Sequence, residues 1–230
     1  IGQEFSLMSF SDGKTIADMP AVQDHKRAYD GDRGPNTGGM GSYSCPDHLL
    51  PFLREEDVRR AHSINSSVAA AVLAETGVPF RGILYGGFMA TRSGVQLIEY
   101  NVRFGDPEAM NVLPILKTDF VSVCEAILSG TLSNLRVEFE NKATVCKYVV
   151  PEGYPDQPKK GVAITVDKKD YNGDLRRYFA SVDEKDGELY LAGSRAVAFV
   201  GIADTLSSAE KIAQEGVTSV SGPVFFRQDI

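Results

Sequence analysis

The chain has 230 residues, enough for one large domain or two small ones, and carries 24 basic against 31 acidic residues. This balance argues against nucleic acid as the main partner, since a nucleic-acid-binding protein is expected to carry a basic face. Three widely spaced cysteines, with no membrane-length apolar run and no signal peptide, favour reduced thiols in a cytoplasmic protein, without a disulfide frame, a zinc site or a membrane partner.

The first expected element is a strand over residues 4–10. The chain then turns at residues 11–14 and returns over residues 15–18, which predicts a hairpin. Because the chain begins with Ile1 and enters this strand directly, we expect the sequence to be a piece of a longer protein.

Residues 19–43 form a long segment rich in glycine, aspartate and proline, which we expect to be irregular. Its glycine-rich part, residues 34–41, has two interpretations: a cradle of backbone amides for an anion, or a plain mobile loop. It is not a Walker loop, because no Gly-Lys-Ser/Thr follows. The preceding Lys26 and Arg27 favour the cradle, since they can hold phosphates, whereas His25 is either a donor to a substrate or a structural hydrogen-bonding group.

A helix is predicted over residues 55–76, with acidic residues in its first turn and Gly77 as its stop. We expect this helix to be scaffold, packed across the sheet that carries Glu99. That sheet is predicted to contain a strand over residues 82–91, joined to the next strand by the two-residue turn Ser93-Gly94.

Glu99, Asn101 and Arg103 lie at every second position of that next strand, so they share one face. Three polar groups on one sheet face indicate either a solvated face or a site for Mg²⁺ and phosphate. Mg²⁺ takes one or two protein oxygens plus phosphate oxygens, and arginine offers a planar fork to phosphate. The predicted turn places Phe88 opposite Glu99 and Gly86 opposite Asn101, where a glycine would let a ligand come close.

The residues after this strand favour the site. Gly105 permits a sharp turn, Asp106 is a good helix N-cap, and Pro107 suits the first helical position. A helix start has free backbone donors that favour anions. We therefore expect a short helix over residues 107–112 beside the polar strand end.

The rest of the chain contains a helix over residues 119–128, ended by Gly130, and then changes near residue 140 to a pattern of short strands separated by turns. Residues 207–210 form a capping box that opens a final helix reaching about residue 220. Between them, strands are predicted over residues 144–150, 161–166, 175–180, 188–192 and 196–202. We place a subdomain boundary at about residue 140.

Two blocks carry a family resemblance. One is Arg-Phe-Gly-Asp-Pro-Glu-Ala-Met at residues 103–110; the other is Gln-Asp-His-Lys-Arg at residues 23–27 with Gly-Pro-Asn-Thr-Gly-Gly-Met-Gly-Ser-Tyr at residues 34–43. Together they resemble the signatures of the glycinamide ribonucleotide synthetase (phosphoribosylamine–glycine ligase) family of the ATP-grasp superfamily. The resemblance covers nearly the whole chain, begins partway into the family's ATP-grasp region, and is looser at residues 193–195, where Gly-Ser-Arg stands for the usual Gly-Gly-Arg.

The resemblance implies an α+β fold. An ATP-grasp large subdomain, with an antiparallel sheet and helices, would be followed by a small β-rich C-terminal subdomain with a terminal helix. Residues 1–140 would be the C-terminal part of the ATP-grasp catalytic domain and residues 141–230 the small subdomain.

The implied reaction is the ATP-dependent ligation of glycine to 5-phosphoribosylamine through glycyl phosphate, a step of purine biosynthesis. It implies Mg²⁺ or Mn²⁺, with ATP as co-substrate, Glu99 and Asn101 as metal ligands and Arg103 as the catalytic residue. The implied substrate-binding residues are Asp24, Lys26, Asn36, Thr37, Gly38, Gly39, Asp106 and Glu108, of which the last two are alternatively helix-capping groups.

The matched region would lack the family's amino-terminal domain and its lysine-bearing lid. The expected partner is therefore the missing N-terminal part of the same chain, and we expect the isolated fragment to have weak or no ligase activity. Two other functions stay open: a different ATP-grasp carboxylate–amine ligase, and a non-catalytic nucleotide-binding module.

Overall fold

The computed structural model describes residues 2–167 and 173–230, which divide into two compact units. Unit 1 contains the chain up to residue 23 and residues 44–141, and unit 2 contains residues 24–43 and 142–230. The sequence division into 1–140 and 141–230 did not include this exchange of residues 24–43. The physical reason is hydrogen bonding, because strand β6 (Gly41–Ser44) enters the main sheet of unit 2 beside β9 (Ala143–Pro151).

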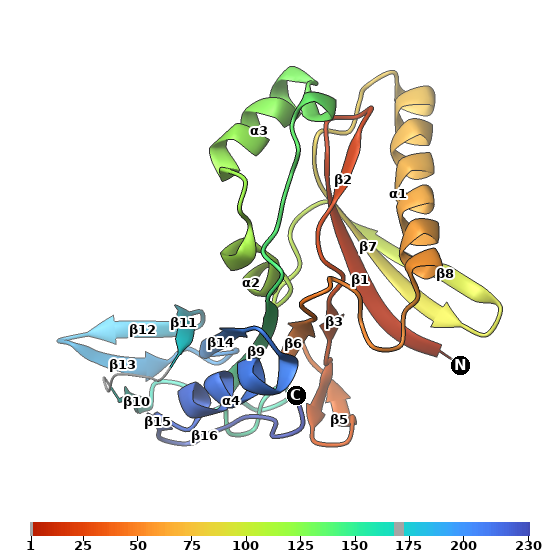
Figure 1. Ribbon diagram of the computed structural model, residues 1–230. Coiled ribbons are helices and arrows are strands. Elements are labelled where there is room, and N and C mark those ends of the chain that lie inside the picture. The colour runs from red at the N-terminus through yellow and green to blue at the C-terminus, as the bar shows by residue number, and fades with distance from the viewer. Residues whose placement is uncertain (1, 168–172) are drawn as a thin grey trace. The chain divides into compact units, whose positions relative to one another are not determined.

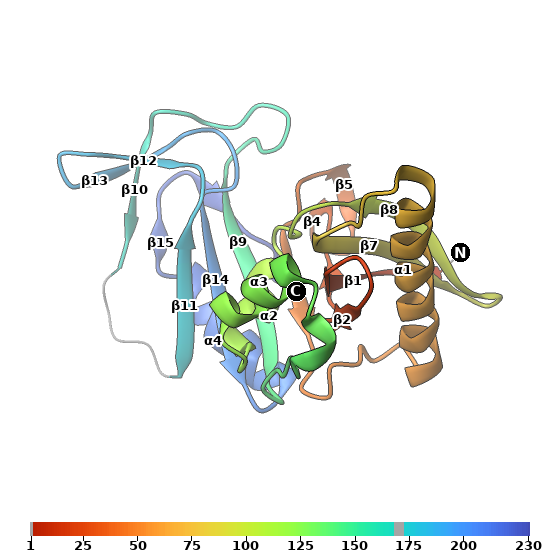
Figure 2. The same cartoon turned by 90° about the horizontal axis from the view of Figure 1, so that it is seen from above.

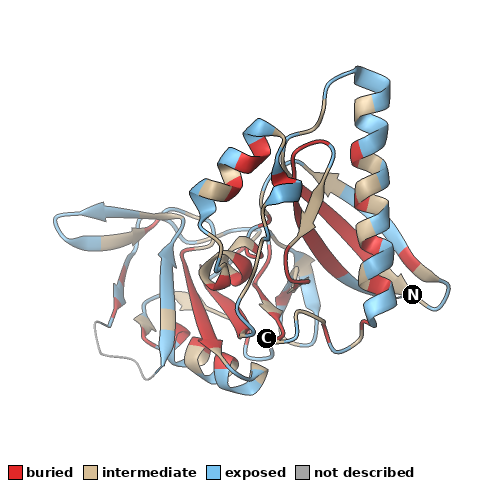
Figure 3. Ribbon diagram, turned by 45° about the horizontal axis from the view of Figure 1, so that its top comes forward, coloured by how far each residue is buried: buried red, intermediate tan, exposed pale blue. Residues whose placement is uncertain are grey.

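Unit 1 is built on an antiparallel sheet of four strands in the order β2-β1-β7-β8 (Figure 1). Their bounds are β1 Gly2–Ser11, β2 Ile16–Asp18, β7 Gly82–Thr91 and β8 Gly94–Asn101. The two predicted hairpins, β1–β2 and β7–β8, are both confirmed. The central strands β1 and β7 carry the buried residues, as Figure 3 shows.

Helix α1 (Glu55–Thr76) covers one face of this sheet and contacts β1, β7 and β8, as expected of a scaffold helix (Figures 1 and 2). The Asp57 carboxylate accepts the Arg54 backbone N–H at 2.9 Å, which caps the N-terminus, and Gly77 ends the helix with a left-handed φ of 69°. Among the residues that the structure describes, no helix is long and apolar enough to span a membrane.

The opposite face of the sheet is covered by α2 (Ala109–Val112) and α3 (Phe120–Ser129), with short 3₁₀ turns at Leu113–Ile115 and Leu132–Asn134 (Figure 1). The Asp119 carboxylate caps α3 and Gly130 ends it, close to the predicted bounds. The core between this sheet face and the helices consists of Met8, Phe10, Met19, Val22, Tyr85, Val112, Val123, Ala126, Ile127 and Leu132.

The predicted register of the β7–β8 hairpin is wrong. Thr91 pairs with Gly94, so the turn comes one residue earlier than Ser93-Gly94, and a bulge follows between Gly87 and Phe88. Glu99 consequently lies opposite Gly87, not Phe88, and Asn101 lies opposite Tyr85, not Gly86. A bulge adds one unpaired residue to one strand, which a turn-based count does not include.

The predicted helix start at Pro107 is also wrong. Residues 106–108 form a turn, α2 begins at Ala109, and the capping position is held by Glu108 rather than Asp106. The first bond of this turn runs from the Ala109 N–H to the Gly105 carbonyl at 2.9 Å.

Residues 19–43 are more regular than expected, because short strands form there. In unit 2, β4 (Arg27–Tyr29) and β5 (Arg33–Asn36) form a separate two-stranded hairpin, whose turn includes left-handed Gly31 and Asp32 with φ of 72° and 53°. Gly41 allows β6 to approach β9, since a Cβ there would lie 2.3 Å from the Cys146 carbonyl oxygen.

The main sheet of unit 2 has the strand order β11-β14-β9-β6-β3, with β16 also pairing with β9. A four-stranded sheet follows the order β12-β13-β10-β15. The remaining bounds are β3 Gln23–Asp24, β10 Ala163–Val166, β11 Asp174–Phe179, β12 Val182–Lys185, β13 Glu188–Leu191, β14 Val197–Ala203, β15 Val220–Ser221 and β16 Val224–Phe225. The five predicted strands are confirmed, whereas β12, β15 and β16 were not predicted.

Helix α4 (Leu206–Val217) packs on β9 and β14. Its N-cap is Thr205, whose hydroxyl accepts the Ser208 N–H at 3.2 Å, so the predicted capping box at residues 207–210 is wrong. Thr205 has extended backbone angles, as an N-cap requires, while Ser207 already lies within the helix.

Candidate functional site

The end of β8 presents the two predicted metal ligands side by side. Glu99 is exposed, Asn101 is half-buried, and the Asn101 amide nitrogen lies 3.4 Å from the Glu99 carboxylate oxygen Oε1. Tyr100, between them, points to the other face, where its hydroxyl donates to Asn65 Oδ1 at 2.9 Å. Strand alternation therefore separates the carboxylate and the amide from the face of the sheet that α1 covers.

On the face that α1 covers, Tyr100 is held by hydrogen bonds that run through neutral side chains to the Asp18 carboxylate. Asn65 is fully buried; it accepts from Tyr100, and its amide nitrogen donates to Ser9 Oγ at 3.1 Å. The Ser9 hydroxyl donates in turn to the Asp18 carboxylate at 2.7 Å. Burial raises the pKa of Tyr100 to about 12, so this phenol stays a hydrogen-bond donor at neutral pH.

The strand ends at Asn101, so Arg103 does not continue its alternation as the sequence predicted. Residues 102–103 form a bend, and the exposed Arg103 guanidinium donates to the Phe104 carbonyl oxygen at 2.8 Å. The last residue of β8 that pairs with β7 is Asn101. The every-second-residue spacing of polar groups continues to Arg103, so the sequence pattern predicted a strand two residues too long.

The turn after the strand is anchored to the sheet by a buried carboxylate. Glu108 is 3% exposed, and its carboxylate accepts the Tyr85 hydroxyl at 2.7 Å. Tyr85 is the cross-strand partner of Asn101, so this bond holds the turn next to the strand end. Gly105 has no room for a side chain, since a Cβ would lie 2.7 Å from the Tyr85 ring, and Asp106 is exposed on the turn.

In unit 2, the β4–β5 hairpin carries several of the predicted substrate-binding residues. Lys26 directly precedes β4 and is half-buried, Asn36 ends β5 and is exposed, and Thr37 follows it. The Thr37 backbone N–H and hydroxyl both donate to the Lys26 carbonyl oxygen, at 2.7 and 2.9 Å, which brings the two strand ends together. Asp24, in β3, is half-buried.

The glycine pair that follows the hairpin is held by residues that sequence reasoning did not select. The Arg195 guanidinium donates to the Gly38 carbonyl at 2.6 Å and to the Gly39 carbonyl at 3.2 Å. It also lies over the Tyr148 ring at 4.6 Å, while the Tyr154 hydroxyl accepts the Gly38 N–H at 3.3 Å. The sequence did draw attention to this region, because residues 193–195 read Gly-Ser-Arg where the family usually has Gly-Gly-Arg, but it did not indicate the contact with Gly38.

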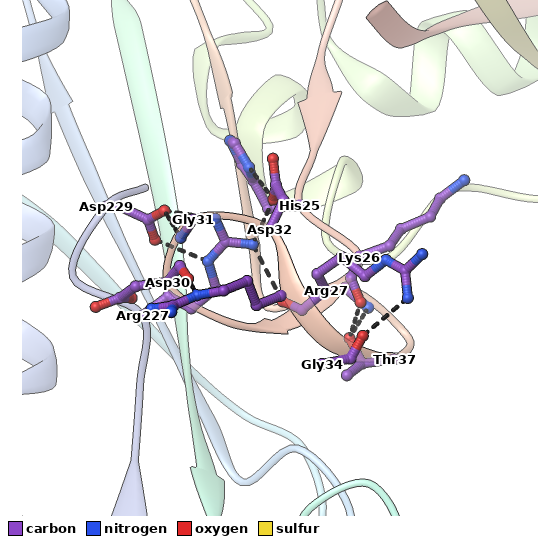
Figure 4. Close-up of polar contacts among 12 residues, drawn as sticks. His25, Lys26, Arg27, Asp30, Gly31, Asp32, Gly34, Thr37, Arg227 and Asp229 are labelled. Atoms are coloured by element: carbon purple, nitrogen blue, oxygen red, sulfur yellow. Dashed lines mark hydrogen bonds and ion pairs between the residues drawn. The ribbon is translucent and has the colours of Figure 1, made fainter.

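The turn of the hairpin is held by a second arginine, Arg227, which sequence reasoning also missed (Figure 4). Its guanidinium lies 2.8 Å from Asp32 Oδ1 and forms two 2.8 Å bonds with the Asp229 carboxylate. Arg227 lowers the pKa of both carboxyls. Burial, followed by the positive charge of Arg227, also lowers the pKa of His25, so this ring is neutral at pH 7.

Comparisons with known proteins define the class of fold. Residues 1–109 match the family model described as "Phosphoribosylglycinamide synthetase, ATP-grasp (A) domain". A biotin carboxylase–β,γ-ATP complex from Campylobacter jejuni aligns with 98% of this chain and 47% of its own at a TM-score of 0.68 and 11% identity, a likeness in fold alone. The fold is that of the ATP-grasp class, with the α+β arrangement of antiparallel sheets and few helices that the sequence predicted.

The particular family follows from the second model and from higher identities. Residues 144–230 match "Phosphoribosylglycinamide synthetase, C domain", and the chain belongs to the phosphoribosylglycinamide synthetase family. A phosphoribosylamine–glycine ligase from Methanosarcina barkeri is 53% identical over 100% of this chain and 52% of its own length. The crystal structure of the Thermotoga maritima phosphoribosylamine–glycine ligase aligns at a TM-score of 0.86 and 34% identity, covering 100% of this chain and 56% of that one. The chain spans about half the length of the curated relatives it matches.

Proposed function

We propose that this chain provides metal-, phosphate- and substrate-binding groups of a phosphoribosylamine–glycine ligase, an ATP-dependent carbon–nitrogen ligase of purine biosynthesis. The observation that carries the proposal is the Glu99–Asn101 pair at the open end of β8, in a chain of this family. In the proposed reaction a glycine carboxylate oxygen takes the terminal phosphoryl group of ATP, giving glycyl phosphate and ADP. The amine of 5-phosphoribosylamine then attacks the glycyl carbonyl and displaces phosphate.

The donor set fits Mg²⁺ or Mn²⁺. Glu99 offers a carboxylate oxygen and Asn101 an amide oxygen, and a hard divalent ion takes one or two such protein ligands with phosphate oxygens filling the rest. The ion, when bound, would neutralise phosphate charge during phosphoryl transfer.

The other predicted residues receive roles consistent with their environment. Arg103 is exposed and close in sequence to the metal ligands, and we assign it to the transferring phosphoryl group. Asp106 is exposed and we assign it to substrate, whereas the buried Glu108 serves through Tyr85 to position the turn. The substrate side of the proposal consists of Asp24, Lys26, Asn36, Thr37, Gly38 and Gly39.

We also propose a cytoplasmic location and a longer active chain. The three cysteines are free thiols, as expected of a cytoplasmic protein. Since the relatives are about twice as long, we propose that the active protein includes a further N-terminal half of the same chain, and that the 230-residue chain alone has weak or no ligase activity.

The test uses a chimera in which this chain replaces the matching part of the Methanosarcina barkeri relative. We expect ADP release that requires both glycine and 5-phosphoribosylamine. Glu99→Gln should lower this rate about 100-fold or more, because it removes a charged metal ligand at unchanged size. The matched control is Glu75→Gln on the exposed surface of α1, which should retain the rate.

Three results would contradict the proposal. ADP release that depends on another carboxylic acid in place of glycine would indicate a different ATP-grasp ligase. Nucleotide binding by an inactive chimera, matched by equal binding to the 230-residue chain alone, would indicate a non-catalytic module. An unaffected Glu99→Gln chimera would remove the assigned metal site.

A further inference from the structure

We propose that Arg227 and Asp229 are positioning residues for the substrate-binding hairpin, because they clamp the β4–β5 turn from a segment about 200 residues later in the chain. The inference rests on the proposed function, since it assumes that Lys26, Asn36 and Thr37 contact substrate. It adds two residues to that function, and both lie outside the two sequence blocks on which the family resemblance was based.

The clamp is a buried guanidinium whose hydrogen bonds go to the hairpin and to Asp229. The Arg227 side chain is 2% exposed. It bonds Asp229 through Nε and Nη2, while Nη1 donates to Asp32 Oδ1 and, at 3.1 Å, to the Arg27 carbonyl oxygen (Figure 4). One planar group thus reaches the first strand and the turn at once.

The backbone of the turn is held by the same segment. The Asp229 carboxylate accepts the Gly31 N–H at 2.8 Å, and the Asp30 carboxylate accepts the Gln228 N–H at 2.9 Å. Asp32 has a left-handed φ of 53°, which aspartate adopts more often than most residues with a side chain, and its carboxylate accepts a hydrogen bond from Arg227. The Tyr29 and Phe225 rings, with centroids 5.9 Å apart, add an apolar contact.

The hairpin needs such support because β4 and β5 form a two-stranded sheet of their own. An isolated two-stranded hairpin is only marginally stable in water. Its open end carries the substrate residues, joined by the Arg27–Asn36 pair and the Thr37 bonds to the Lys26 carbonyl. Fixing the turn therefore limits the orientations available to that end.

The charged character of the clamp points to positioning more than to stability. The Asp32 and Asp229 side chains are 66% and 36% exposed, so solvent screens their ion pairs with Arg227 and these pairs contribute little net stability. The Arg227 guanidinium instead fixes geometry, because the planar fork of arginine sets the angle of each bonded group, which a lysine cannot do.

The first test measures amide hydrogen exchange in the 230-residue chain. In Arg227→Gln, the amides of Gly31 and Thr37 should exchange about tenfold faster or more, while those of Val145 and Val200 in the main sheet stay unchanged. Arg227→Lys should behave like Arg227→Gln, because charge alone does not restore the fork. Arg176→Gln, which breaks an Arg–Asp pair on β11, is the matched control and should leave the hairpin amides unchanged.

The second test uses steady-state kinetics of the chimera. A positioning role predicts that kcat/KM for glycine or 5-phosphoribosylamine falls about tenfold through a raised KM, with kcat nearly retained. A merely structural role predicts fewer active molecules, hence a lower kcat at unchanged KM. Asp229→Asn, which leaves the Arg227–Asp32 bond in place, provides a second variant if Arg227→Gln does not fold.

The two proposals fail in different ways. Unchanged hairpin exchange, or a KM equal to that of the unsubstituted chimera, overturns the clamp while leaving the ligase function intact. If the unsubstituted chimera shows no ligation, the proposed function falls, and the exchange measurement decides by itself whether Arg227 and Asp229 hold the hairpin.

Discussion

At the end of β8 in unit 1, Glu99 and Asn101 are directed by strand alternation and by a neutral network behind them, from Tyr100 through Asn65. In the β4–β5 hairpin of unit 2, the turn is held instead by ionised groups around Arg227. Both regions present polar side chains, but the first depends on packing against a helix and the second on charge. The two should therefore respond to different perturbations.

The largest effect is expected from breaking the neutral network. Asn65→Leu should lower the free energy of unfolding of unit 1 by about 2 to 3 kcal/mol, because the Tyr100 hydroxyl loses its acceptor and Ser9 loses a donor. Amide hydrogen exchange of β1 and β7 measures this in unit 1 alone. Adding Tyr100→Phe should recover part of the loss, since no hydroxyl then needs a partner.

The control for that prediction is Ser67→Ala on the exposed side of α1, which should change stability by no more than about 0.5 kcal/mol. Equal exchange in Asn65→Leu and the unsubstituted chain would show that the network does not hold the strand end.

A pair of adjacent glycines tests the two faces of β7. Gly86→Ala should cost about 2 kcal/mol, because its Cβ would lie 2.5 Å from the Phe88 ring and 2.7 Å from Asn65 Oδ1. Gly87→Ala, facing Glu99 with its nearest atom at 3.5 Å, should stay within about 0.5 kcal/mol. Urea unfolding followed by the same β7 amides compares them, and equal costs would contradict the assigned faces.

The smallest effect is expected from acid. Arg227 lowers the folded-state pKa of Asp32 and Asp229, so the stability they provide is fully present above the unfolded pKa of about 3.9 and is lost as pH falls below it. The stability difference between the unsubstituted chain and Arg227→Gln should therefore shrink from pH 5 to pH 2. Asp32 is 66% exposed, so solvent screening keeps the change small.

Circular dichroism at a series of urea concentrations measures this difference, with Arg176→Gln as the control. A difference that grows on acidification would contradict the ionic origin of the clamp.

Sequence reasoning succeeded where the determinants are local. The bounds of α1 follow from its acidic first turn and from Gly77, and the opposite orientations of Glu99 and Tyr100 follow from strand alternation. It failed in the register of the β7–β8 hairpin, where the turn comes one residue earlier and a bulge between Gly87 and Phe88 adds one residue, so that Glu99 pairs with Gly87.

The hairpin clamp was beyond sequence reasoning for a different reason. Arg227 and Asp32 are 195 positions apart, and neither residue has a local pattern that indicates the other. Arg195 and Gly38, 157 positions apart, are the same case. Contacts of this kind are determined by tertiary packing. The sequence could therefore indicate the substrate-binding segment around residues 24–39, but not the distant arginines that hold it.

The most direct test of the assigned metal site is the binding of Mn²⁺ with ADP to the chimera, followed by electron paramagnetic resonance. Glu99→Gln should weaken Mn²⁺ binding about tenfold or more, equivalent to about 1.4 kcal/mol, while Glu75→Gln binds as the unsubstituted chimera does. Equal Mn²⁺ affinity in Glu99→Gln and the unsubstituted chimera would contradict the assignment of the β8 strand end as the metal site.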